Sequence, residues 1–175
     1  MVNDLTQKTP ADFDSYEPDL IPHHVFFDEQ SEQIKREKYV VFCLGADFFA
    51  VSTDKVSEAI QMLAITPLPN VPEWLLGIAD LRGTMISVVN LQKLLDMPDT
   101  TVSPRTKFVV LKSPDFPSTV ALAVDRLSEI IALPNEEIQF IKDGKTPLVL
   151  GKAMYTFNTL TLLNVENLLS SLTIQ

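Results

Sequence analysis

The chain has 175 residues, 46% of them hydrophobic, which is enough to bury the core of one domain or of two small subdomains. Its 23 acidic and 14 basic residues give a net charge of −9, which would repel a phosphate backbone, and no cluster of Lys and Arg offsets it. The apolar runs have the length of strands, well short of the ~20 residues that cross a bilayer. We therefore expect a protein that binds no nucleic acid, does not insert into a membrane and, without a secretory signal, resides in the cytoplasm.

Residues 1–36 differ in composition from the rest of the chain. They hold more than half of the net negative charge, and Pro10, Pro18 and Pro22 interrupt any helical pattern. We predict a flexible acidic extension, in which the apolar residues 25–27 are able to dock on the folded domain. Two roles remain open for it: an extension that keeps the protein soluble, or a tether for a partner.

Residues 37–175 form the predicted folded domain, because short apolar stretches alternate there with Gly, Pro, Asn and Asp, as in strands joined by turns. Strands at 39–44 and 47–52 are expected to form a hairpin around the Gly45-Ala46 turn. A helical turn is predicted at 55–60 and a third strand at 61–66, which ends at three closely spaced prolines.

A second hairpin follows, with strands at 75–81 and 84–89 joined at Arg82-Gly83 and a helical turn at 91–95. Further strands are predicted at 107–111, 119–124, 128–133, 148–155 and 159–163, with a terminal helix at 165–172. Closed barrels would remove the exposed edges of so many short strands.

The two halves of this domain share local sequence. Residues 56–60 (Val-Ser-Glu-Ala-Ile) resemble residues 127–131 (Leu-Ser-Glu-Ile-Ile), and a Leu-Pro-Asn sequence follows each of them. The similarity supports two related small barrels packed together.

The residue types that carry catalysis are scarce. His23 and His24 are the only histidines and lie in the acidic extension, so the predicted domain lacks the commonest base and zinc ligand. The five glycines follow no nucleotide-binding spacing. Cys43 lies in an apolar run, where a buried structural thiol is expected. We therefore predict a protein that is not an enzyme and that has no metal and no cofactor.

Two side chains instead suit a protein interface. Trp74 either plugs one end of a barrel or contacts a partner. Arg82 stands at a tight turn between apolar strands, where its guanidinium can make several directed hydrogen bonds. It is expected either to pair with Asp80 or to contact a partner.

Eight segments follow one another in the order typical of a known family: 42–45, 49–51, 56–60, 66–72, 77–83, 88–91, 123–131 and 162–169. The most specific are the Gly-Ile-Ala-Asp-Leu-Arg-Gly hairpin at 77–83 and the Val-Asp-Arg-Leu-Ser-Glu-Ile-Ile segment that ends at residue 131. In them, and from about Lys38 to near its end, the chain resembles the CheW-like domain family of bacterial chemosensory systems.

The resemblance implies a mainly β fold of two intertwined, five-stranded, SH3-like β-barrels with short helices. It also implies a non-catalytic scaffold in two-component signalling. Such a scaffold links the cytoplasmic tip of a methyl-accepting chemoreceptor to a CheA-type histidine kinase, and it contacts other CheW-like domains within the signalling array.

The resemblance also implies where these partners bind. The receptor tip would lie in an apolar groove near Val56, Glu58 and the hairpin residues Asp80, Leu81, Arg82 and Gly83. The kinase would bind other surfaces of the barrels.

Three residues depart from the family pattern: Asp80 replaces an asparagine, Ser87 a proline and Asn90 an aspartate. Asp80 introduces a charge that is able to pair with Arg82, the first of the two roles expected for that arginine. These changes leave open whether the pathway is flagellar chemotaxis or type IV pilus motility. Two other functions stay open as well: an antagonist that binds only the kinase or only the receptor, and a β-barrel regulator that binds a small ligand.

Overall fold

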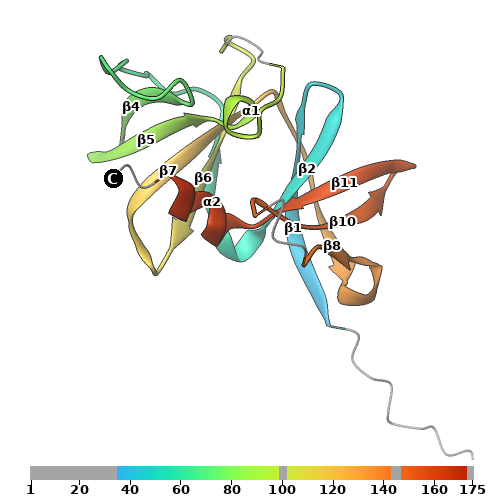
Figure 1. The fold of residues 1–175 in the computed structure, drawn as a ribbon. Coiled ribbons are helices and arrows are strands. Elements are labelled where there is room, and N and C mark those ends of the chain that lie inside the picture. Colours follow the sequence, from blue (N-terminus) through green and yellow to red (C-terminus); the bar gives the residue numbers. More distant parts are fainter. Residues whose placement is uncertain (1–34, 99–101, 143–146, 173–175) are drawn as a thin grey trace, which may run out of the picture. The chain divides into compact units, whose positions relative to one another are not determined.

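The computed structural model describes residues 35–98, 102–142 and 147–172 (Figure 1). These residues belong to one compact unit. The predicted acidic extension at 1–36 lies outside the described residues apart from its last two.

The first sheet combines strands from both ends of this unit. Its strand order is β8-β1-β2-β11-β10-β9. The strands are β1 (Arg36–Leu44), β2 (Asp47–Ser52), β8 (Arg126–Pro134), β9 (Gln139–Phe140), β10 (Val149–Tyr155) and β11 (Asn158–Leu163). All neighbouring pairs are antiparallel except β2 and β11, which are parallel.

The second sheet is built from the middle of the chain, in the order β3-β6-β7-β5-β4. The strands are β3 (Val56–Ile60), β4 (Leu75–Leu81), β5 (Thr84–Asn90), β6 (Lys107–Ser113) and β7 (Phe116–Val124). The short helices are the 3-10 turns η1 (Thr53–Lys55) and η2 (Asn135–Glu137) and the α-helices α1 (Leu91–Leu94) and α2 (Val165–Ser171).

The chain therefore leaves the first sheet after β2, builds the second, and returns through β8, as Figure 1 shows. This path confirms the predicted mainly β fold of two intertwined barrels. The first sheet has six strands where five were expected, because the two-residue strand β9 pairs with β10 at Gln139 and Phe140.

Each sheet has a core of its own, and a third core joins the two. Tyr39, Val41 and Leu160 belong to the core of the first sheet, and Ile86, Phe108 and Val110 to that of the second. The joining core takes buried side chains from both sheets and from both α-helices, among them Phe42, Phe49, Val89, Leu91, Val120, Leu122 and Leu168. Removing this much apolar surface from water stabilises the two barrels as one folding unit.

Two predicted elements are wrong. The helical turn predicted at 55–60 is strand β3, because its backbone pairs with β6, which lies some fifty residues further along the chain. Such a distant partner overrides local propensity. The strand predicted at 61–66 is irregular and makes one isolated bridge, between Thr66 and Ile78.

The two halves repeat the same hairpin. In the β4–β5 hairpin Gly77 lies opposite Val88, and in the β10–β11 hairpin Gly151 lies opposite Leu162. A bulge precedes each glycine, and each hairpin sets its second strand parallel to a strand from elsewhere. Strands β3 and β8 likewise take the same edge position in the two sheets. The sequence similarity between 56–60 and 127–131 therefore reflects a structural repeat.

Each repeat ends in a capped helix. The Asn90 side-chain oxygen accepts the Lys93 backbone N–H at 3.2 Å and begins α1. Asn164 accepts the Asn167 backbone N–H at 3.1 Å and begins α2. Asparagine and aspartate serve equally well at this position, so Asn90 keeps the function of the aspartate that it replaces.

Glu166 of α2 links three elements, and it makes stability depend on pH. It pairs with Lys55 of η1, and the Ser113 hydroxyl donates to it at 3.0 Å. The hydrogen bond from Lys55 is the main cause that lowers the pKa of Glu166. The folded state thus favours the charged carboxylate, and this stabilisation is present above the ordinary carboxyl pKa and is lost as the pH falls through the lowered one.

We expect Glu166→Gln to lower the free energy of unfolding at about pH 7 by at most about 1 kcal/mol, because the pair is partly exposed. The difference from the wild type should shrink at a second, acidic pH, because the carboxylate becomes protonated as the pH falls through its lowered pKa. Urea denaturation at the two pH values measures the free energy of unfolding of the wild type and of the variant. Glu73→Gln is the control, because its ion pair with Lys93 leaves Glu73 87% exposed. An effect of Glu166→Gln that is equal at both pH values would contradict this role.

Candidate partner-binding groove

A groove of about 390 Å³ lies between the equivalent edge strands β3 and β8, and we call it the inter-barrel groove. Its lining residues are Val40, Val41, Thr53, Val56, Ser57, Glu58, Ala59, Leu127, Ser128, Glu129 and Ile130. The two walls present matching sequences, with an apolar, a serine, a glutamate and an apolar residue on each. The groove is thus apolar with one carboxylate on each side.

On the β3 side, Arg82 holds the carboxylate of Glu58. Its Nη1 donates to Oε1 at 3.2 Å and its Nη2 to Oε2 at 2.9 Å, a two-pronged arrangement that fixes the guanidinium plane. The Arg82 side chain is still 79% exposed, against 26% for Glu58. A partner in the groove can therefore reach both the guanidinium and the apolar wall.

Asp80 shapes the turn that carries Arg82. Its Oδ1 accepts the Gly83 backbone N–H at 3.0 Å. Arg82 and Gly83 both have positive φ, 54° and 85°, as in the two-residue turns that suit the twist of a hairpin. The expected pairing of Asp80 with Arg82 is wrong, because the aspartate faces the backbone of its own turn while the arginine reaches across to Glu58. The asparagine of the family could make the same backbone bond.

The structure brings some of the six predicted site residues together and keeps others apart. Val56 and Glu58 line the groove, and Arg82 joins them through its ion pair. Leu81 packs instead against the core of the second sheet. Asp80 and Gly83 are exposed and form the turn.

None of the predicted site residues lies on the β8 wall of the groove. The Tyr155 hydroxyl donates to Glu129 at 2.6 Å and lies 3.0 Å from the Ser128 hydroxyl. The hydrogen bond to Glu129 is the main cause that raises the pKa of Tyr155. Ile130 is 62% exposed on the same wall. The internal sequence repeat carried the signal for this wall, because Glu129 stands where Glu58 stands in the first copy.

A CheW-like domain model matches residues 38–173, nearly all of the predicted domain. The chain belongs to the CheW-like domain family. It is 26% identical over 108 residues to the chemotaxis protein CheW of Bacillus subtilis, a match that covers 62% of this chain and 68% of that protein. It is 24% identical over 139 residues to the chemotaxis protein CheW of Klebsiella aerogenes, covering 77% of this chain and 82% of the relative.

The fold of this CheW-like domain matches that of the scaffolding protein TtCheW from Thermoanaerobacter tengcongensis. The TM-score is 0.67 at 24% sequence identity, over 74% of this chain and 90% of TtCheW. The similarity supports the arrangement of two interleaved sheets described above.

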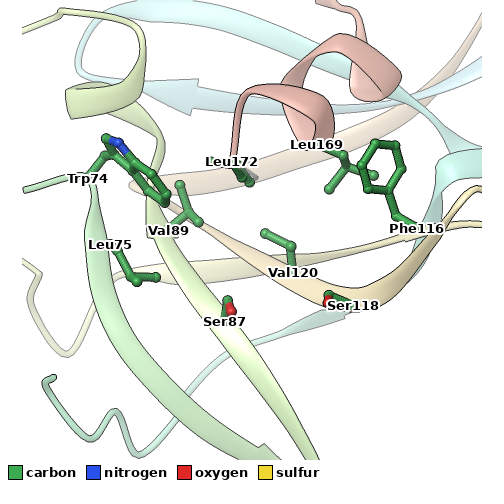
Figure 2. Close-up of a pocket in the computed structure, with 9 residues that line it drawn as sticks. All are labelled: Trp74, Leu75, Ser87, Val89, Phe116, Ser118, Val120, Leu169 and Leu172. Atoms are coloured by element: carbon green, nitrogen blue, oxygen red, sulfur yellow. The ribbon is translucent and has the colours of Figure 1, made fainter. Parts of the chain in front are cut away.

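A second pocket, of about 300 Å³, lies against α2 on the second sheet, and we call it the Trp74 pocket (Figure 2). Its lining residues are Trp74, Leu75, Ser87, Val89, Phe116, Ser118, Val120, Leu169 and Leu172. Trp74 and Phe116 stand at its two ends, and Leu169 and Leu172 reach it from α2. Ser87, which replaces the usual proline of CheW-like domains, is thus part of a pocket and not of the inter-barrel groove.

The structure also places the other features that could carry chemistry, namely the single cysteine and the side chains able to bind a metal ion. Cys43 is buried, and the Arg126 guanidinium lies 3.2 Å from its sulfur. Residues 35–98, 102–142 and 147–172 of this CheW-like domain contain no group of three or more His, Cys, Asp or Glu side chains placed to hold a metal ion. Within the same ranges no helix has the length and hydropathy needed to span a membrane.

Proposed function

We propose that the chain is a non-catalytic adaptor in the cytoplasm that couples a methyl-accepting chemoreceptor to a CheA-type histidine kinase. Membership of the CheW-like domain family supports this function, as do relatives that are themselves named chemotaxis proteins. The observation that carries the receptor part of the proposal is the inter-barrel groove, with its apolar walls and charged rims.

The groove has the features of a site for an amphipathic protein segment. Val56, Leu127 and Ile130 offer apolar surface that a partner would remove from water. Glu58 and Glu129 lie on opposite walls, and Arg82 adds a directed cation on one side. Polar groups around an apolar centre fix the register of a bound segment more than they add affinity.

Coupling in this proposal is a matter of linked binding equilibria. The receptor occupies the groove and the kinase binds other surfaces of the barrels, so one adaptor holds both. A conformational change in the receptor then alters the kinase through the free energy that links the two sites. The buried interiors of both barrels are packed with apolar side chains, which disfavours the alternative of a ligand held inside a barrel.

Reconstitution tests this proposal. Kinase autophosphorylation is measured with a receptor cytoplasmic fragment, with and without the chain, for candidate pairs from flagellar and pilus pathways. We expect at least a several-fold stimulation with the cognate pair. Inhibition would identify an antagonist, and no effect with any pair that binds the chain would contradict coupling.

The same assay tests Arg82. We expect Arg82→Ala to weaken receptor binding and kinase stimulation about tenfold, within the range of interface arginines. Its stability should change by less than about 1 kcal/mol, because the ion pair with Glu58 is exposed. Arg105→Ala is the matched control, since Arg105 is exposed in a loop and does not line the groove. Equal receptor binding by both variants would remove Arg82 from the interface.

A further inference from the structure

The two walls of the inter-barrel groove carry matching β-bulges. In the β3–β6 pair, Ser57 is an extra residue between Val56 and Glu58. In the β8–β1 pair, residues 128–129 lie opposite the single residue Val41. A bulge turns side chains away from the regular alternation of a strand. Each wall therefore presents its Ser-Glu pair at the point where the strand is irregular.

A side chain from the hairpin of the same sheet holds each glutamate, and the two holders differ in charge. Arg82, in the β4–β5 turn, makes the two-pronged ion pair with Glu58. Tyr155, the last residue of β10, donates its hydroxyl to Glu129 at 2.6 Å and lies 3.0 Å from the Ser128 hydroxyl. The arginine neutralises its glutamate. The tyrosine is neutral, so it fixes the position of the Glu129 carboxylate and leaves the charge in place.

The support for Glu129 is present before any partner binds. The Tyr155 ring packs edge-on against Phe48, with the ring centroids 5.1 Å apart. The pKa of Tyr155 is raised, mainly by the hydrogen bond to Glu129, so the hydroxyl stays protonated and remains a donor. A carboxylate can accept about four hydrogen bonds, so this contact leaves capacity for a partner. A carboxylate held in this way loses little conformational freedom when the partner pairs with it.

We propose that Glu129, positioned by Tyr155, binds an arginine or lysine of the protein segment that occupies the inter-barrel groove. This inference rests on the proposed function, in which that segment belongs to a chemoreceptor. Glu58 and Glu129 are the charged residues among the described side chains that line the groove, and Arg82 neutralises the first. Glu129 is exposed and forms no salt bridge within residues 35–98, 102–142 and 147–172. A cation of the partner therefore finds its counter-charge on the β8 wall.

The difference between the walls also selects the orientation of the bound segment. The Arg82 side chain is 79% exposed and donates hydrogen bonds, whereas Glu129 accepts them. A segment fits when its apolar stripe meets Val56 and Ile130, a basic residue faces the β8 wall and a carboxylate or a backbone carbonyl faces Arg82. The reverse orientation places like charges together, which costs binding free energy.

Titration calorimetry with a receptor cytoplasmic fragment tests the contact. Glu129→Gln removes the charge and keeps the shape, and it should weaken binding about tenfold at low salt. The effect should be smaller at about 300 mM salt than at about 50 mM, because salt screens an exposed ion pair. Glu136→Gln is the matched control, since it removes the same charge from an exposed residue of η2 that does not line the groove. The control should bind as the wild type does.

Charge reversal on both partners identifies the basic residue. Glu129→Lys should weaken binding more than Glu129→Gln, because it opposes a like charge. Each arginine and lysine of the receptor tip is then changed to glutamate. One of these receptor variants should bind the Glu129→Lys protein at least tenfold more tightly than the unchanged receptor does, and the others should not.

Tyr155→Phe tests the positioning role, because it keeps the ring and removes the hydroxyl. It should weaken binding about threefold without a change in melting temperature, and the coupling between Glu129 and the basic residue should fall in a double-mutant cycle. Equal binding by Glu129→Gln and Glu136→Gln, or no recovery with any receptor variant, would overturn the inference and leave the adaptor function intact. A wild type that binds no receptor fragment would overturn the proposed function, and this inference with it.

Discussion

Ile130→Asp is expected to abolish binding of the receptor fragment and, with it, receptor-dependent control of the kinase. Ile130 lies on the β8 wall of the inter-barrel groove and is 62% exposed before any partner binds. The aspartate removes an apolar anchor and adds a third carboxylate to the groove that Glu58 and Glu129 already line. A partner that covers it must desolvate an unpaired charge. We expect a loss of at least about 3 kcal/mol in binding free energy, which is more than a hundredfold in affinity.

The variant should still fold, because the side chain of Ile130 faces solvent and contributes little to a core. Met154→Asp is the matched control: Met154 is 68% exposed on β10 and does not line the groove. Receptor binding is measured by titration calorimetry, with circular dichroism for the fold. Tight receptor binding by Ile130→Asp, or its loss in Met154→Asp, would place the receptor site elsewhere and leave membership of the family intact.

Local sequence signals were sufficient for most of the strands. Glycine-containing turns and short apolar runs placed both hairpins, the capped helices and the late strands, because those elements depend on neighbours close in the chain. Strand β3 was missed for the opposite reason. Its partner strand β6 is distant in sequence, and no local pattern within residues 55–60 indicates that pairing.

Only the β3 side of the groove was predicted from the sequence, and the β8 side was missed for a related reason. The hairpin motif and the first Val-Ser-Glu segment pointed to Val56, Glu58 and Arg82, which the structure does bring together. Only the packing of the two barrels, which sets the edge strands β3 and β8 on either side of the groove, places Glu129 and Ile130 opposite them. The directions of the side chains could not be predicted from the sequence either. Asp80 and Arg82 are two residues apart, yet Asp80 accepts a backbone N–H of the turn and Arg82 reaches Glu58.

Gly77→Ala is expected to destabilise the fold more than Gly45→Ala or Gly151→Ala. A Cβ at Gly77 would lie 2.2 Å from the Thr66 carbonyl oxygen and 2.9 Å from the Pro67 Cα, and both are backbone atoms. The φ of Gly77 is +142°, a conformation that residues with a side chain rarely adopt. The alanine must therefore separate Thr66 from Ile78, which are joined by two backbone hydrogen bonds of 2.8 and 3.0 Å.

Overpacking and backbone strain together should cost about 3–5 kcal/mol, a large part of the 5–15 kcal/mol that typically stabilises a domain. Substitutions at two other glycines separate the cost of overpacking from the cost of backbone strain. Gly45→Ala meets no atom within 4 Å and keeps a φ of +59°, so it should cost only about 1–2 kcal/mol of conformational strain. Gly151→Ala meets the Gln139 carbonyl oxygen at 2.8 Å without a positive φ and should fall between the two.

Urea denaturation of the three variants gives the order directly. If Gly77→Ala costs no more than Gly45→Ala, the Thr66 bridge yields easily and does not hold residues 61–72 against the second sheet. If the expected order is found, the close approach at Gly77 fixes that segment, whose Leu63 and Ile65 pack on the core of the second sheet. The glycine of the family hairpin motif would then serve the fold of the second barrel, while the arginine five residues later serves its surface.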